Sequence, residues 1–128
     1  MIKAKKKPRY VLIMEDNSAH AELLTETLDH HFSPVIIHTV DTFKAGLEFL
    51  TRTPYRLIIT ESVVSGERVE NRLKEIIKKH KRLPVIVITG RGNESLAVKL
   101  TRMGATEYLV KTRETLDTLP HILEKYLS

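Results

Sequence analysis

Five short apolar runs alternate with five stretches of helical spacing along the chain. The runs lie at 10–14, 35–37, 57–60, 85–89 and 108–110, and their β-branched residues are typical of buried strands. Between the runs, apolar residues recur every three to four positions, as they do on one face of an amphipathic helix. This alternation predicts an α/β fold in one domain, with a five-stranded parallel sheet and helices on both of its faces.

Local signals predict where the helices begin and end. Ser18 is expected to cap the first helix, and Asp41 or Thr42 the second. Gly104 is a good residue to end the fourth helix. Pro120 fits the last helix only in its first turn, because a proline further inside removes a backbone hydrogen bond.

Positive charge is concentrated at the start of the chain. The net charge is +5, and five of the 21 basic residues fall within the first ten positions, which leaves 16 basic residues against 16 acidic ones. We expect residues 1–8 to form a disordered basic leader and residues 9–128 to form the domain. Binding of nucleic acid by the basic start is the alternative, and deleting residues 1–9 would test it. A second basic cluster is interpreted as a solvated helix face: Lys74, Lys78, Lys79, Lys81 and Arg82.

Composition excludes several classes of function. The chain has no cysteine, so it has neither disulfides nor thiolate chemistry. No apolar run approaches the roughly 18 residues of a membrane span, and we expect a cytoplasmic protein without a membrane partner. The six histidines lack metal-ligand spacing and are expected at the surface or at helix ends. No glycine-rich phosphate loop and no nucleophile with a base is found, so neither an organic cofactor nor enzymatic activity is expected.

Charged residues follow several of the predicted strands. Right-handed crossovers bring the carboxyl ends of parallel strands to one rim, where α/β sheets bind ligands. Glu15 and Asp16 follow the first strand, Glu61 the third and Lys111 the fifth, while Thr89 ends the fourth. Three acids repel one another unless a cation lies among them, and oxygen ligands suit Mg²⁺. The rim therefore predicts a pocket for a small, highly charged tetrahedral group.

Three segments at this rim carry a family resemblance. Residues 11–17 (VLIMEDN), 83–90 (LPVIVITG) and 104–111 (GATEYLVK) resemble, in this order, blocks of the CheY-like receiver domains of two-component response regulators. The resemblance extends over about residues 9–127. It implies a flavodoxin-like fold with strand order 2-1-3-4-5 and a sensor histidine kinase or another signalling protein as partner.

The resemblance also implies a role for each residue at a matching position. Glu15 and Asp16 match the acidic pair that binds Mg²⁺, and Glu61 matches the aspartate that accepts the phosphoryl group. Thr89 matches the hydroxyl residue of the phosphoryl site, Tyr108 the aromatic switch and Lys111 the invariant lysine.

Several positions depart from the pattern of the family. Glu61 stands in place of aspartate, while Ser65 and Val69 stand where proline and glycine are usual, and Thr112 replaces a common proline. Glutamate is one methylene longer than aspartate, which displaces its oxygens by about one bond length, whereas a preorganised site tolerates roughly 0.5 Å. We therefore expect an atypical receiver that does not use normal aspartate phosphorylation and acts as a protein-interaction module. Glu61 would pair with Lys111 and imitate a phosphorylated aspartate in part.

Two further readings remain open from the sequence. One is a phosphorylation-competent receiver that accepts a phosphoryl group from a histidine kinase at Glu61. The other is a small flavodoxin-like nucleotide-binding protein or enzyme. In receivers the output surface comprises the fourth helix, fifth strand and fifth helix, which implies a homodimer or an acidic partner here. That surface would expose Tyr108 and four cations: Arg91, Lys99, Arg102 and Arg113.

Overall fold

A parallel sheet of five strands forms the centre of the molecule. The computed structural model describes residues 7–128, and within them the sheet has the order β2-β1-β3-β6-β7 with every neighbouring pair parallel. The strands are β1 (Arg9–Met14), β2 (Val35–Val40), β3 (Leu57–Thr60), β6 (Val85–Thr89) and β7 (Glu107–Val110). Counted along the chain, this is the predicted order 2-1-3-4-5, so the expected fold is confirmed.

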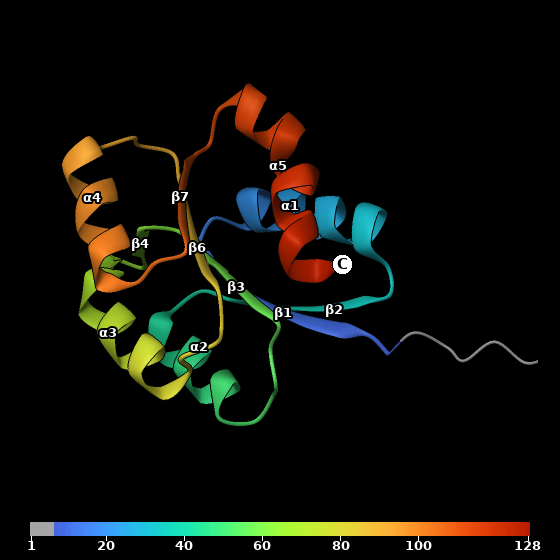
Figure 1. Ribbon diagram of the computed structural model, residues 1–128, viewed down its shortest axis with the longest axis horizontal. Coiled ribbons are helices and arrows are strands. Elements are labelled where there is room, and N and C mark those ends of the chain that lie inside the picture. Colours follow the sequence, from blue (N-terminus) through green and yellow to red (C-terminus); the bar gives the residue numbers. More distant parts are fainter. Residues whose placement is uncertain (1–6) are drawn as a thin grey trace, which may run out of the picture.

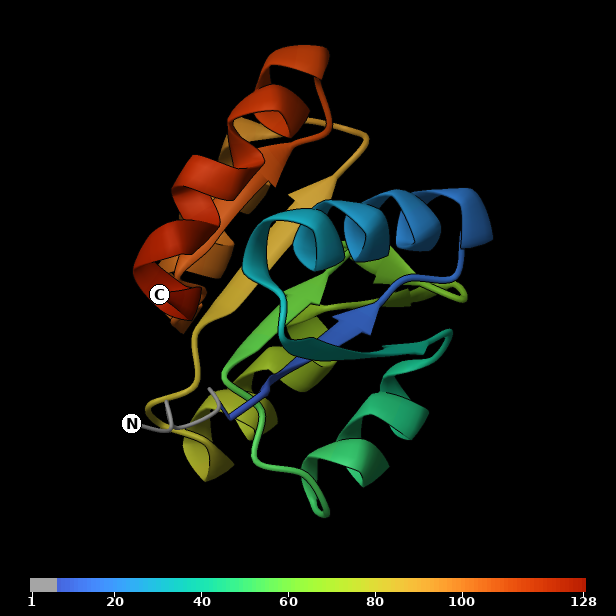
Figure 2. The ribbon, with the colours of Figure 1, turned by 90° about the vertical axis from the view of Figure 1, so that its right-hand side faces the viewer.

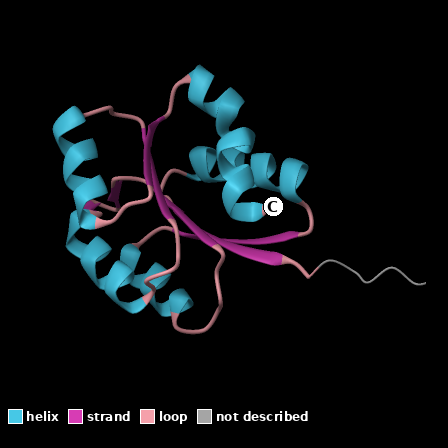
Figure 3. Ribbon diagram, in the orientation of Figure 1, coloured by secondary structure: helices cyan, strands magenta, loops and turns pink. Residues whose placement is uncertain are grey.

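Helices cover both faces of the sheet. They are α1 (Ser18–Phe32), α2 (Phe43–Leu50), α3 (Glu70–Lys79), α4 (Glu94–Met103) and α5 (Arg113–Leu127). Figures 1 and 3 show α1 and α5 on one face and the other three helices on the opposite face. Figure 2 shows the strands side by side, with their arrowheads toward the same edge.

The alternation of side chains along β1 divides the core into two layers. Leu12 and Met14 pack beneath α2, α3 and α4, whereas Val11 and Ile13 pack against α1 and α5. All four side chains are fully buried. A strand buried on both faces is apolar throughout, which explains why the runs of the inner strands β1, β3 and β6 were visible in the sequence.

The helix caps agree with the sequence in part. Thr42 caps α2 by accepting a hydrogen bond from the Ala45 amide, and Gly104 ends α4 with a φ of 112°. The expectation for the first helix was wrong, because Asn17 is the cap and accepts from the His20 amide at 3.0 Å.

The predicted place of Pro120 was also wrong. Helix α5 begins at Arg113, after the cap Thr112, so Pro120 lies inside the helix. Three buried leucines, at positions 119, 123 and 127, hold α5 against the sheet on both sides of the proline. Tertiary packing of this kind offsets the backbone hydrogen bond that proline cannot donate.

A small hairpin after β3 was not predicted. Strands β4 (Val63–Val64) and β5 (Glu67–Arg68) pair antiparallel around a two-residue turn. Ser65 and Gly66 both have positive φ, 48° and 80°, as a type I′ hairpin turn requires.

The expected basic leader falls mostly on residues 1–6, which lie outside the described residues. Within residues 7–128, no helix is both long enough and apolar enough to cross a membrane.

Candidate functional site at the carboxyl rim

Backbone hydrogen bonds fix the positions of the charged residues that follow the strands. The amides of Glu15, Glu61 and Lys111 each donate to a residue of the adjacent strand or its end, at 3.0, 3.0 and 2.8 Å respectively. The parallel ladder thus continues for one residue beyond β1, β3 and β7. These three side chains, with Asp16 and Thr89, lie at the edge that we call the carboxyl rim.

Lys111 contacts two carboxylates at the carboxyl rim. Its Nζ donates to Glu15 Oε1 at 2.5 Å and lies 3.5 Å from Glu61 Oε1. The side chains are largely removed from water, with exposures of 11% for Lys111, 3% for Glu15 and 17% for Glu61. Charges in such a position are less screened than surface charges, so the ammonium group neutralises much of the repulsion between the two acids.

Both oxygens of Glu61 are hydrogen-bonded. The Ser62 amide donates to Oε2 at 2.5 Å, and the Gly90 amide donates to Oε1 at 3.3 Å. With Lys111, this carboxylate is surrounded by two amides and one ammonium, which come from the ends of three strands. Donors of this kind form an anion-binding site, and the carboxylate of Glu61 itself occupies it.

Asp16 turns away from Lys111 and toward the hairpin. Its Oδ2 accepts a hydrogen bond from the Ser65 amide at 2.9 Å. Proline at position 65 could neither donate this hydrogen bond nor adopt the φ of 48°. This arrangement of the loop therefore excludes the proline that the family usually has at this position.

The hydroxyl of Thr89 is directed toward Ser62. The two hydroxyl oxygens are 3.0 Å apart, and both residues are buried. The hydroxyl of Tyr108 donates to the Arg91 carbonyl at 3.3 Å. Ser62 was not among the predicted site residues, although its place directly after Glu61 offered a signal.

His20 also reaches the carboxyl rim and was not predicted there. Its Nδ1 lies 2.9 Å from Lys111 Nζ and 3.5 Å from Glu15 Oε1, while about half of the side chain is exposed. The histidine stands in the first turn of α1, which begins directly after the acidic pair. The sequence spacing alone did not relate His20 to Lys111. The first turn of α1 brings the two side chains together.

Of the three carboxylates that were expected to share Mg²⁺, Glu15 and Glu61 both contact Lys111, whereas Asp16 accepts a hydrogen bond from the hairpin. Within residues 7–128, no group of three acidic or histidine side chains has an arrangement that could hold a metal ion. Glu15 faces Lys111, Asp16 is bound to the Ser65 amide, and Glu61 is bound to two amides. A divalent ion that bound Glu15 would compete with Lys111 for this carboxylate.

The order of the strands agrees with a comparison to known families. The family model of the response regulator receiver domain matches residues 11–123 of this chain. This chain belongs to the receiver domain family. It is therefore the receiver domain of a response regulator of a two-component system.

Individual relatives agree with this assignment. The response regulator protein FleR of Pseudomonas aeruginosa is 35% identical over 81% of the chain, and RegA of Rhodobacter capsulatus, a photosynthetic apparatus regulatory protein, is 27% identical over 91%. The chain spans 22% of the length of FleR and 62% of that of RegA.

Solved structures show the same fold. A signal receiver domain from Vibrio parahaemolyticus is 27% identical, with a TM-score of 0.83 over 94% of this chain and 91% of that one. The Mn²⁺-bound form of the response regulator Rcp1, 23% identical, also has a TM-score of 0.83, over 94% of this chain and 96% of that one. At that identity the likeness concerns the fold alone.

Proposed function

We propose that this receiver domain is a signalling module that works through protein interactions and does not cycle through an acyl phosphate. The family resemblance implies that Glu61 stands at the phosphoacceptor position. The proposal rests on the contacts of its carboxylate. This carboxylate accepts hydrogen bonds from the Ser62 and Gly90 amides, and its Oε1 lies 3.5 Å from Lys111 Nζ.

The contacts of Glu61 oppose its use as a nucleophile. Attack on phosphorus needs a carboxylate oxygen that can approach in line, while a cation neutralises the incoming phosphate. Here each oxygen is occupied by an amide, and Lys111 is bound more closely to Glu15 than to Glu61. The extra methylene of glutamate also moves the oxygens by about one bond length, more than the roughly 0.5 Å that such a site tolerates.

The same contacts favour a permanent imitation of the phosphorylated state. Two amides and an ammonium group around a small anion are the donors that a phosphoryl group would need. The carboxylate supplies one negative charge, whereas a phosphoryl group carries about 1.5 to 2. We therefore infer a domain held largely in one signalling state.

The partner is a sensor histidine kinase or another signalling protein, and the surface of α4, β7 and α5 is the proposed contact. Arg91, Lys99, Arg102 and Arg113 are exposed there, and Val98 on α4 is 50% exposed. This composition favours either an acidic partner or a second copy of the domain. Light scattering over a range of concentrations tests the second copy, and a monomer throughout would contradict it.

Treatment with a small phosphate donor and Mg²⁺, followed by intact-mass measurement, tests the proposal. We expect no stoichiometric adduct on this chain. An active receiver in the same tube shows that the donor works. Glu61→Asp is the matched variant, and uptake by it alone would show that side-chain length sets the outcome. Stoichiometric uptake that is lost in Glu61→Gln would overturn the proposal and favour the phosphorylation-competent alternative.

A Mg²⁺ titration tests the remaining expectation for the rim. Binding would require the ion to break the contact between Lys111 and Glu15. We expect Lys111→Gln to bind Mg²⁺ more tightly than the unchanged chain does, because it removes the competing ammonium group. Equal affinities would show that Lys111 does not compete for the acidic pair.

A further inference from the structure

A cleft with a volume of about 880 Å³ lies at the opposite end of the sheet from Glu61. Its walls are the loop from α2 to β3, the loop from α3 to β6 and the last turn of α5. Helices in this fold run antiparallel to the strands, so their carboxyl ends meet at the edge where the strands begin. We call this edge the amino rim.

The lining of this cleft carries seven cations and no acid. Five belong to the two loops or to the end of α3, and all are exposed: Arg52, Arg56, Lys78, Lys81 and Arg82. None of these five forms an ion pair with a carboxylate within residues 7–128. The other two, Lys79 and Lys125, pair with Glu75 and Glu107 outside the lining. We call this concavity the basic cleft.

Helix dipoles explain only some of these charges. Lys78 and Lys79 in the last turn of α3, and Lys125 in that of α5, stabilise the negative carboxyl ends of their helices. Arg56, Lys81 and Arg82 lie outside helices, so this benefit is small for them. Several like charges around one concavity repel one another, and the fold gains nothing evident from this group. Such an arrangement is typical of a site for an anion.

The cleft lacks the features of a peptide-binding or base-stacking site. The exposed large apolar residues of the described chain, Leu23, Ile36, Val63 and Val98, do not line it. Protein partners usually bind through large apolar or aromatic anchors, and none of these four exposed residues lies in the lining. Of the two tyrosines in the lining, Tyr55 is 9% exposed, and Tyr126 donates its hydroxyl to Glu107 and carries Lys125 over its ring.

We propose that the basic cleft binds a soluble ligand with consecutive phosphate groups, either a free polyphosphate or the phosphate chain of a nucleotide. Linked phosphates bring several negative charges within a few ångströms, which matches cations that converge from three elements. Three of the seven cations are arginines, whose planar guanidinium groups bind phosphate oxygens in pairs. The volume lies within the roughly 300 to 1,000 Å³ of small-molecule sites.

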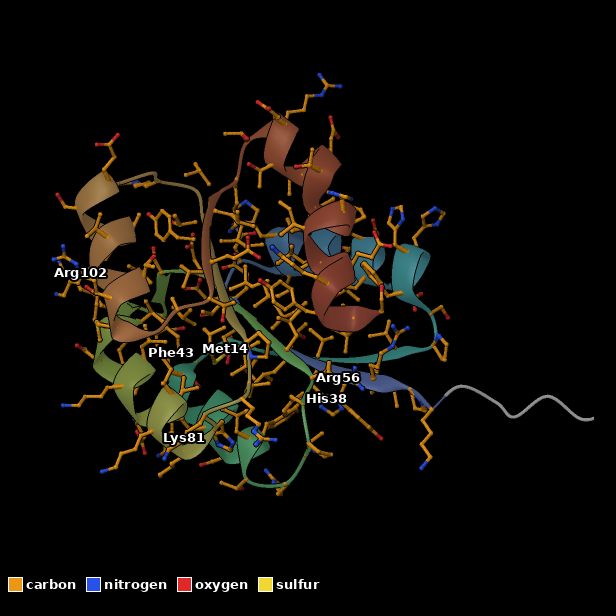
Figure 4. All side chains as sticks on the ribbon, in the orientation of Figure 1. Met14, His38, Phe43, Arg56, Lys81 and Arg102 are labelled. Atoms are coloured by element: carbon orange, nitrogen blue, oxygen red, sulfur yellow. The ribbon has the colours of Figure 1, made fainter. Side chains whose placement is uncertain are left out.

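Calorimetric titration with inorganic tripolyphosphate at physiological ionic strength tests this site. We expect each of two single variants, Arg56→Gln and Lys81→Gln, to bind roughly tenfold more weakly than the unchanged chain, since each loses one charge-assisted contact. Arg102→Gln is the matched control, because it removes an exposed arginine of α4 that does not line the cleft. Figure 4 labels all three positions: Arg102 lies on α4, whereas Arg56 and Lys81 lie in the two loops that line the cleft. The control should bind within about twofold of the unchanged chain.

The basic start of the chain is the same in every variant, so its attraction for polyanions cancels in the comparison. Circular dichroism confirms that each variant is folded. No binding of tripolyphosphate, or equal losses in Arg56→Gln and Arg102→Gln, would overturn the site. Tighter binding of a glutamate-rich peptide or of an oligonucleotide with the same charge would overturn the ligand class. A parallel titration with ATP tells the two sources apart: tighter binding indicates the nucleotide, and equal or weaker binding indicates the phosphates alone.

Discussion

The carboxyl rim and the basic cleft lie at opposite ends of one sheet and hold charge in different ways. At the carboxyl rim, Lys111 is almost buried and satisfies two acids, and backbone amides satisfy the remaining oxygens. In the basic cleft, five exposed cations have no acidic partner within the described residues. A cluster in which opposite charges are paired contributes to stability and resists a ligand, whereas a cluster of unpaired like charges costs stability and favours the binding of a ligand.

The largest effect is expected from removing the cation of the carboxyl rim. Lys111→Met would leave the buried Glu15 without its counter-ion and should lower the free energy of unfolding by about 3 kcal/mol. Lys99→Met is the control, because Lys99 is 59% exposed and lies 3.9 Å from Glu70, and its loss should cost less than about 1 kcal/mol. Urea unfolding measures both. Equal losses would mean that the carboxyl rim is no more tightly coupled than the surface.

The second largest effect concerns the buried hydroxyl pair beneath Glu61. Ser62→Ala removes the partner that lies 3.0 Å from the Thr89 hydroxyl, and we expect a loss of about 1 to 2 kcal/mol. Ser95→Ala, at an exposed position of α4, should change stability by less than about 0.5 kcal/mol. The same unfolding experiment compares the two. A neutral Ser62→Ala would show that the pair contributes nothing to the stability of the rim.

A smaller effect is expected beside the basic cleft, at Tyr126. Burial, together with its hydrogen bond to Glu107, raises the pKa of Tyr126 to about 12. The folded chain therefore holds this proton more tightly than the unfolded chain, whose tyrosines have a pKa of about 10. The resulting stability is fully present below about pH 10 and is lost as the pH rises toward 12.

Tyr126→Phe tests this assignment in two ways. It should cost about 1 kcal/mol at neutral pH, through the lost hydrogen bond. It should also remove one of the four tyrosines from the absorbance titration, at the alkaline end near pH 12. A titration of Tyr126→Phe that keeps its full amplitude there would assign the late step to another residue.

The smallest effect, with the opposite sign, is expected inside the basic cleft. Lys81→Gln relieves repulsion among neighbouring cations, so stability at low salt should rise slightly, by no more than about 0.5 kcal/mol. Added salt screens the same repulsion and should remove the difference. Thermal unfolding at two salt concentrations measures it. A clear loss of stability would mean that Lys81 has an intramolecular role and that the contrast between the two ends is wrong.

The sequence contained most of the fold because the inner strands β1, β3 and β6 are largely buried on both faces. Such strands are continuous apolar runs, and the rule for crossovers then places Glu15, Glu61 and Lys111 at one edge. The hairpin was missed because each of its strands has only two residues, although Ser65-Gly66 between short flanking segments is a turn signal. Pro120 was misplaced because packing outweighed a local backbone rule.

The basic cleft could not be predicted because its residues are far apart in the sequence. Lys78, Lys81 and Arg82 were interpreted as part of a solvated helix face, since neighbouring charges on a helix usually are. Arg52 and Arg56 join them only when the loop before β3 folds beside the loop before β6. Charge was visible in the sequence, but its convergence depends on the register of two strands.

The short length of β3 has a consequence for how the two ends of the sheet communicate. Its four residues span about 13 Å, which exceeds the Debye length of about 8 Å at physiological ionic strength. Direct charge coupling through solvent between Glu61 and the cations at the start of the strand is therefore weak. Substitutions at the two ends should combine additively, so natural selection can alter one end of the domain without retuning the other.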